Sequence, residues 1–434
     1  MKIAILVSNV VVAGIGLYNT IISKAFTRNN VHTDIFVFST SNEINDFTLY
    51  KDTQTNYIIG NFSQETYDKL NSYDYVFLNA MPHISDSQEY RDAYYDMVVN
   101  KITTKKIFSP HERQLRAFKR QYDERLFSYE FLNAFHRIVT YDVDAEVFKE
   151  FRNVVGDSII SKFLPLELPY EFNTDHWKPI EEKDPRITYF GRVNRLKYPD
   201  RLIEIAADLH KAGLQAEMRG ITRSVGCLAI RNLVYEWDEN NKPTSEPSKS
   251  IIWFNKAYRD AHGIDKKVKY LTRYTNNTGK VLVFPAYNYN EGIEALSHQA
   301  YGCDFFKLKD NIYGYAPEFA IYDMVKAGVI PVMDYDLGLY TKIRKDGQDI
   351  GKTLIDTKAG IFLKSDLSNL TDVIEEMTFL FENPEEYEKK RRLCFDVFSA
   401  HTNPDNIVKN LIKGFTTENT YTYNKPTFTA NSLF

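Results

Sequence analysis

The sequence contains only three cysteines, Cys227, Cys303 and Cys394, which lie far apart without a Cys-x-x-Cys pair. A disulfide scaffold or a cysteine zinc site is therefore not expected, and a reducing cytoplasm suits the chain. The nine histidines are scattered. Walker, HExxH and Ser-His-Asp patterns are also absent, so the sequence predicts no metal requirement and no covalent nucleophile of those types.

Long apolar runs are lacking as well, and no membrane span is expected because no stretch of about 18 apolar residues occurs. The apolar residues 1–7 resemble the start of a signal peptide. Ser8 and Asn9 interrupt it, however, and no small-residue cleavage site follows, which favours a buried β-strand. An excess of positive charge is missing too, because 54 basic and 58 acidic residues give a net charge of −4. Binding to nucleic acid would therefore need a local patch.

What the sequence does contain is the composition of a two-domain globular protein. Its 434 residues exceed one ordinary core, and 43% are hydrophobic and 26% charged. Short apolar segments alternate with helical patterns, which predicts βαβ units and parallel sheets. The expected strands are 3–7, 35–38, 75–78, 107–108, 138–141, 187–190, 215–219, 281–284, 329–333 and 361–363, and helices are expected over 199–209, 370–382 and 384–398.

Prolines and polar residues over 164–186 have linker composition, and the domain boundary is predicted there. The fold class is accordingly α/β, with two Rossmann-like doubly wound domains facing a central cleft. We expect an N-terminal domain over 1–168, a linker over 169–186, a C-terminal domain over 187–400 and a tail over 401–434 that packs back toward the N-terminal domain. The polar segment 235–250 is expected to form an exposed loop.

Two segments of the C-terminal half carry the strongest chemical signal. The strand 187–190 ends in Gly191 and is followed by Arg192 and Lys197, cations that suit a diphosphate. Glu318 and Asp323 stand before and within a helix that leads into the strand 329–333, and carboxylates suit sugar hydroxyls. A doubly wound sheet would bring both segments to one edge. The alternatives are a surface loop with scattered cations, and a helix cap beside a solvated acid.

The N-terminal half offers weaker signals at strand ends. A loop containing Gly14 and Gly16 follows the first strand and opens a helix, so Gly16 is assigned to donor binding. Because position 19 is Asn, the dinucleotide fingerprint fails, and a plain turn is the alternative. His111 and Glu112 follow the strand 107–108, where they could act on a sugar or its acceptor. The alternative for this pair is a capping turn with solvated charges.

A basic helical face follows directly. Arg113, Arg116, Lys119 and Arg120 are candidate contacts to a polyanionic acceptor such as DNA. An ordinary solvated face is the alternative, and a second basic run over 266–269 is equally ambiguous.

Together these motifs resemble GT-B fold glycosyltransferases and, more closely, the DNA α-glucosyltransferase family of T-even bacteriophages. The similarity runs in order through most of the chain. It is carried by residues 73–79 with Pro82, by 109–112, by 137–140, by Gly191 and Arg192 with Lys197, and by 318–323 with 328–332.

The resemblance implies roles for individual residues. His111 and Glu112 match a His-Asp pair beside the transferred sugar, and Arg192 and Lys197 match cations that bind the diphosphate. His111, Glu112 and Arg192 are accordingly the predicted catalytic residues.

Two donor-binding acids follow from the same resemblance. Glu318 matches a donor-binding glutamate, and Asp323 matches a second glutamate that holds the ribose in related retaining enzymes. Glu112 and Asp323 depart from the family's Asp and Glu by one methylene each, which bears on the identity of the sugar more than on the reaction class.

The family takes a sugar from a UDP-sugar and attaches it, with retention, to 5-hydroxymethylcytosine in phage DNA. The resemblance therefore implies a monomeric, metal-independent transferase of glucose or a pentose such as arabinose, with double-stranded DNA as partner in the host cytoplasm. Two other hypotheses stay open: a cytosolic GT-B enzyme acting on lipopolysaccharide, capsule or another glycan, and a catalytically idle module that binds sugar or nucleic acid.

Overall fold

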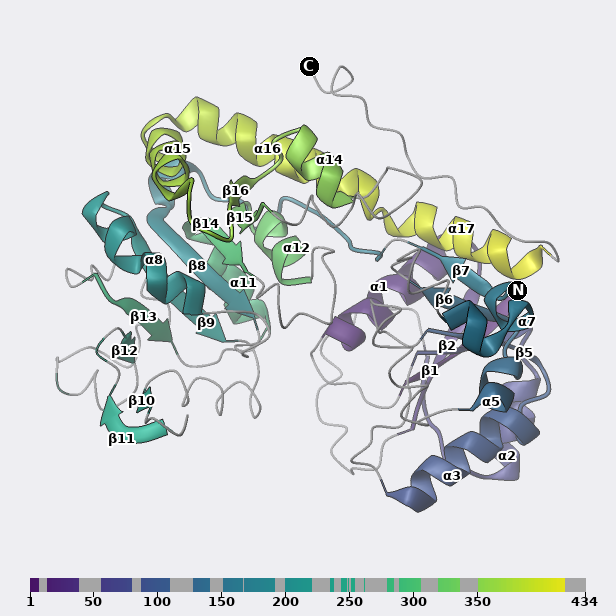
Figure 1. Cartoon of the computed structure of the whole chain (residues 1–434). Coiled ribbons are helices and arrows are strands. Elements are labelled where there is room, and N and C mark those ends of the chain that lie inside the picture. The colour runs from purple at the N-terminus through teal and green to yellow at the C-terminus, as the bar shows by residue number, and fades with distance from the viewer. Residues whose placement is uncertain are drawn as a thin grey trace.

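The computed structural model describes residues 1–7, 14–38, 56–79, 87–109, 128–140, 151–166, 168–191, 200–220, 235–237, 243–247, 249, 251–253, 261, 279–284, 289–305, 319–335 and 350–417. Figure 1 shows these residues as two lobes, each built around one large sheet.

In the first lobe, the described residues form a seven-stranded, wholly parallel sheet in the order β3-β2-β1-β4-β5-β6-β7. Its strands are β1 (Lys2–Val7), β2 (His32–Val37), β3 (Asn56–Ile59), β4 (Tyr75–Leu78), β5 (Lys105–Phe108), β6 (Arg137–Thr140) and β7 (Phe163–Pro165). The strand order reverses between β1 and β4, and ligands of doubly wound sheets bind beyond the carboxyl ends of strands at such a switch point.

The apolar runs that predicted these strands reflect burial on both faces. In β1, Ile3 and Ile5 enter one hydrophobic core while Ala4 and Leu6 enter the core on the opposite face. A strand covered on both sides has no solvent face that would call for alternating polar residues.

Helices cover both faces of this sheet. On one side lie α1 (Gly14–Arg28) and α17 (Pro404–Thr416), whose apolar residues share a core with β1. The other side is covered by α2 (Gln64–Asn71), α3 (Gln88–Asp96), the π-helical turn η2 (Met97–Lys101), α5 (Tyr129–Asn133) and α7 (Asp157–Ile160). Ser63, Ser87 and Ser128 cap α2, α3 and α5 by accepting a first-turn backbone N–H, which sets where these helices begin.

The second sheet is also seven-stranded and parallel within the described residues, in the order β12-β13-β9-β8-β14-β15-β16. Its strands are β8 (Asp184–Gly191), β9 (Gln215–Gly220), β12 (Ile251–Trp253), β13 (Val281–Phe284), β14 (Gln299–Asp304), β15 (Ile330–Asp334) and β16 (Ile361–Leu363). Here the switch point falls between β8 and β14.

The remaining helices belong mainly to the second lobe. They are η3 (Ile180–Glu182), α8 (Asp200–Lys211), α11 (Tyr289–Ser297), α12 (Phe319–Lys326), α14 (Ile350–Asp356), α15 (Leu370–Glu382) and α16 (Pro384–His401). Figure 1 shows α16 and α17 in succession across the top of both lobes. Among the described residues, no helix is long and apolar enough to cross a membrane.

The structure corrects several predictions of elements. The segment 235–250 is not wholly a loop, because β10 (Tyr235–Trp237) and β11 (Pro243–Pro247) pair antiparallel. The predicted loop around Gly14 is wrong, because α1 already begins there. The sequence did not predict the strands β3, β7, β12 and β14 or the helices α2, α3, α5, α7, α11, α14 and α17.

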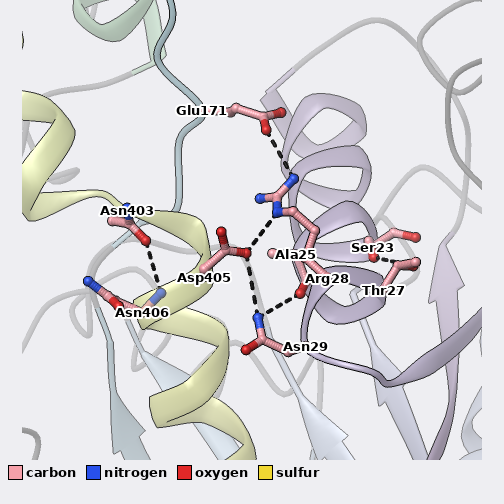
Figure 2. A network of polar contacts seen from close by, with 9 residues as sticks. All are labelled: Ser23, Ala25, Thr27, Arg28, Asn29, Glu171, Asn403, Asp405 and Asn406. Atoms are coloured by element: carbon pink, nitrogen blue, oxygen red, sulfur yellow. Dashed lines mark hydrogen bonds and ion pairs between the residues drawn. The ribbon is translucent and has the colours of Figure 1, made fainter.

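The two lobes are joined by the linker and by the passage from α16 to α17. One continuous core includes residues of α1, the linker, α12, α16 and α17. At its edge, Arg28 of α1 donates to Glu171 of the linker at 3.0 Å and to Asp405 of α17 at 2.8 Å (Figure 2). These bonds are partly exposed, so each contributes modestly; the first connects α1 to the linker and the second connects α1 to α17.

Candidate functional site

The two strongest sequence segments meet at the switch point of the second sheet. Gly191 ends β8 with φ of +130°, and a Cβ built on it would lie 3.5 Å from the Cβ of Ala320 in the first turn of α12. Arg192 follows Gly191 and Glu318 precedes α12 in sequence, and both lie outside the described residues together with Lys197. The predicted meeting of the segments is thus confirmed for Gly191 and α12.

The close seating of α12 on the sheet depends on a glycine in β14. A Cβ at Gly302 would come within 2.7 Å of the Met324 sulfur, so a larger residue would require the Met324 side chain to move. Met324 also joins Phe190 of β8 in a small buried core. Met324 therefore packs α12 against both β14 and β8.

Asp323 is the described member of the predicted acid pair. It lies in the second turn of α12 as expected, and its side chain is nearly buried, with 3% of the residue exposed. One of its oxygens, Oδ1, accepts a hydrogen bond from the Tyr170 hydroxyl. Sequence reasoning did not find Tyr170, because it stands in a proline-punctuated segment that has linker composition.

Tyr170 itself lies in a cluster of rings between the lobes. Its ring centre is 4.7 Å from that of Phe172, 5.2 Å from that of Tyr322 and 5.6 Å from that of Phe319. Its backbone N–H donates to the carbonyl of Thr402 at 2.9 Å, where α16 gives way to α17. Asp323 is therefore oriented by the chain segment that joins the lobes.

Behind the edge of the second sheet lies a buried ionic network that was not predicted. Glu217 of β9 accepts from Arg186 at 3.0 Å, from Arg219 at 2.5 Å and from Thr188 at 2.8 Å. The side chains of the three charged residues are at most 3% exposed. Burial alone would raise the pKa of Glu217, but the guanidinium groups of Arg219 and Arg186 outweigh it and leave the pKa lowered.

This network fixes the strands that carry Gly191. Arg219 stands opposite Phe190 in the register of β8 and β9, one residue before the Gly191–Gly220 pair. Its guanidinium carbon lies 4.1 Å from the centre of the Phe284 ring on the neighbouring β13. Noncovalent contacts thus connect β8, β9 and β13 next to the candidate site.

In the first lobe, Gly16 lies buried in the first turns of α1, and its carbonyl accepts a hydrogen bond from the Thr20 hydroxyl at 3.0 Å. Nearby, Asn79 at the carboxyl end of β4 donates to Asn19 of α1 at 2.5 Å, with both side chains fully buried. This bond connects α1 to the switch point of the first sheet. The assignment of Gly16 to donor binding stays a prediction.

The remaining predicted residues follow β5. Its last described neighbour, Ser109, donates its backbone N–H to Leu78 of β4 at 2.9 Å. Ser109 therefore lies at the carboxyl edge of the sheet. His111, Glu112, Arg113, Arg116, Lys119 and Arg120 lie outside the described residues, and their roles stay predictions. Within the described part of the chain, no three His, Cys, Asp or Glu side chains are grouped as a metal site.

No protein-family model and no curated protein matches the sequence. Solved structures do match. An alpha-glucosyltransferase in complex with UDP-glucose and DNA containing an abasic site is 16% identical with a TM-score of 0.70, covering 96% of this chain and 100% of that one. An alpha-glucosyltransferase in complex with UDP and a 13-mer DNA containing a HMU base is also 16% identical, with a TM-score of 0.69 and coverage of 96% and 100%.

A further match is HepE of Anabaena in complex with UDP and glucose, at 10% identity and a TM-score of 0.53, with coverage of 95% and 98%. Identities this low establish the fold alone. The GT-B architecture of two doubly wound domains, predicted from the sequence, is confirmed, and so is the resemblance to the alpha-glucosyltransferase structures at the level of the fold.

Proposed function

We propose that this protein is a retaining glycosyltransferase that moves a sugar from a UDP-sugar to 5-hydroxymethylcytosine in double-stranded DNA. The observation that carries the proposal is the junction of Gly191 with the first turn of α12 at the switch point of the second sheet. That junction belongs to the two segments that supply Arg192 and Lys197 on one side and Glu318 and Asp323 on the other.

The comparisons support the donor and the acceptor to different degrees. UDP or UDP-glucose accompanies the two alpha-glucosyltransferase structures and the HepE structure. DNA accompanies the alpha-glucosyltransferases, whose structures cover nearly the whole of this chain. A UDP-sugar donor is therefore the broader inference and a DNA acceptor the narrower one. Glucose or a pentose such as arabinose fits the proposal equally.

In the proposed reaction, Arg192 and Lys197 neutralise the diphosphate as it leaves the sugar. The acceptor hydroxyl attacks the anomeric carbon from the face that the diphosphate vacates, and its proton passes to the departing diphosphate. Glu318 and Asp323 bind hydroxyls of the donor, and Gly16 lets the first lobe approach it. No protein nucleophile and no metal is required.

The acceptor half of the reaction belongs to the first lobe. His111 and Glu112 stand beside the transferred sugar, and the basic residues that follow them contact the DNA phosphates. The hydroxymethyl group of a paired cytosine lies in the major groove, so the modified base is flipped out of the duplex to bring this group to the donor. The enzyme acts as a monomer in the cytoplasm of a host cell that contains the modified DNA.

The test is a transfer assay. The purified protein is incubated with several UDP-sugars and with duplex DNA that contains or lacks 5-hydroxymethylcytosine. The DNA is then digested to nucleosides, whose masses are measured by mass spectrometry. A gain of one sugar mass on the hydroxymethylated nucleoside alone supports the proposal. UDP release without any gain of nucleoside mass would indicate a glycan acceptor instead of DNA. Absence of both UDP release and nucleoside gain would indicate a module that binds without catalysis.

Removing three cations from the basic segment is expected to weaken DNA binding and its dependence on salt. Each neutralised phosphate contributes about 0.9 to the slope of log affinity against log salt. Replacing Arg116, Lys119 and Arg120 by alanine should therefore make that slope shallower by up to about 3. Fluorescence anisotropy of a labelled duplex across a salt series measures it.

The second basic run provides a matched control, because it also contains three cations. Alanine at Lys266, Lys267 and Lys269 should leave the slope as in the unaltered protein. If this second variant loses the slope and the first keeps it, the DNA lies on the second lobe and the assignment is wrong.

A further inference from the structure

We infer that Tyr170, in the linker between the lobes, is the positioning residue for the donor-binding carboxylate of Asp323. The inference rests on the proposed function, because it assigns Asp323 to the donor. It adds a residue outside both Rossmann-like sheets to the donor site. The linker then takes part in binding as well as joining the lobes.

The Tyr170 hydroxyl is held in place from several sides. The residue is 1% exposed, and its backbone N–H is bonded to Thr402 at 2.9 Å. Its ring packs against Phe172 of the linker and against Phe319 and Tyr322 of α12. Such packing leaves the ring one orientation, so its hydroxyl reaches Asp323 without further loss of freedom.

Asp323 gains a fixed direction from this bond. A carboxylate has two oxygens, and a bond to one of them sets the direction of the other. The bond from Tyr170 to Oδ1 does this and also satisfies an acceptor in a nearly buried place, where an unmet acceptor is costly. The second oxygen is then set as well, and the inference assigns it to a ribose hydroxyl.

The linker is well suited to this task because it is anchored to both lobes. Glu171, the next residue, accepts from Arg28 at the end of α1, and Arg28 also bonds Asp405 of α17 (Figure 2). The backbone around Tyr170 is thus held by the first lobe while its side chain acts on α12 of the second.

The test is Tyr170→Phe, which keeps the ring and its packing and removes only the hydroxyl. We expect the KM for the UDP-sugar and the Kd for UDP to rise about tenfold, as befits a lost hydrogen bond to a charged group. The kcat should change by less than about twofold, because the ribose contact is made equally in the ground state and the transition state. Initial rates and titration calorimetry give these quantities.

Tyr301→Phe is the matched control, since that hydroxyl is also buried and donates to the carbonyl of Met377 at 2.5 Å, outside the candidate site. It should lower thermal stability without raising KM. An equal rise in KM for both variants would mean general loosening and would overturn the inference. An unchanged KM for Tyr170→Phe would also overturn the inference. A lower KM would overturn it too, because the Tyr170 hydroxyl would then compete with the donor for Asp323.

A double-mutant cycle tests whether Tyr170 acts through Asp323. In an Asp323→Asn background, Tyr170→Phe should cost less than about a third of what it costs alone, whereas independent residues give full additivity. Additive effects would overturn the inference while leaving the transferase intact. If the unaltered protein binds no UDP and turns over no UDP-sugar, the proposed function itself fails and the inference falls with it.

Discussion

Turnover is expected to fall by about 100- to 1,000-fold when Arg192 is replaced by alanine, the loss that follows removal of one group that stabilises charge in a transition state. The leaving diphosphate gains negative charge as its bond to the sugar breaks, and a guanidinium can hold two of its oxygens at once. Gly191 directs the chain to this place, because it ends β8 in contact with the first turn of α12. Initial rates at saturating UDP-sugar measure the effect.

Two further variants separate charge, geometry and folding. Arg192→Lys should recover part of the lost rate, because a lysine keeps the charge but lacks the planar fork. Lys211→Ala removes an exposed cation of the same lobe and should leave the rate unchanged. All variants should melt as the unaltered protein does. A rate for Arg192→Ala within about twofold of normal would remove Arg192 from the mechanism.

Much of the fold could be predicted because a buried parallel strand corresponds to a short run of apolar residues in the sequence. The strands β4, β13 and β16 were placed at their observed residues, and each is a short run of apolar residues. A strand covered on both faces has no reason to alternate, so its sequence is apolar throughout. The same argument placed Gly191 and α12 at one edge, since parallel strands direct their carboxyl ends the same way.

The interior strand β14 shows where prediction from an apolar run fails. All six of its residues are buried, yet the sequence Gln-Ala-Tyr-Gly-Cys-Asp has polar ends and a glycine. Gly302 is there because α12 packs against it, and that requirement comes from a helix that follows in sequence. The local sequence pattern of a strand does not show which residues another element will pack against.

Tyr170 and Glu217 escaped prediction for a related reason. The bond between Tyr170 and Asp323 joins residues 153 positions apart, and the linker has a composition typical of an exposed connection. Glu217 reads as a polar residue in a strand, and only the fold brings Arg186 of β8 beside it. The chemistry of both depends on distant partners, whereas the cations after Gly191 were proposed from their spacing, and their role stays a prediction.

Replacing Glu217 with glutamine is expected to lower the free energy of unfolding by about 3–5 kcal/mol. The substitution keeps the shape of the side chain but removes the charge that the guanidinium groups of Arg186 and Arg219 share, in side chains 3% and 0% exposed. Asp184, 3.7 Å from Arg186, stays as a second counter-charge for that group. Removing one partner of a buried pair is costly because the remaining charge has lost its solvent as well as its partner. Urea unfolding followed by circular dichroism at neutral pH measures the difference.

Asp208→Asn is the control for loss of a carboxylate, because its pair with Lys211 is largely exposed and should be worth less than about 1 kcal/mol. An effect of Glu217→Gln no larger than that of the control would mean that water or neighbouring groups already solvate the two guanidinium groups.

The dependence on pH gives the same prediction a second and independent form. Because the pKa of Glu217 in the folded protein lies below its ordinary value of 4.5, ionised Glu217 stabilises the fold fully above that ordinary value. This contribution is lost as the pH falls through the folded pKa, where Glu217 becomes neutral as glutamine is. The stability gap between the unaltered protein and Glu217→Gln should therefore be constant near neutrality and close only in acid below about pH 4.5. A gap that closed above pH 6 would mean that a group other than Glu217 balances the two arginines.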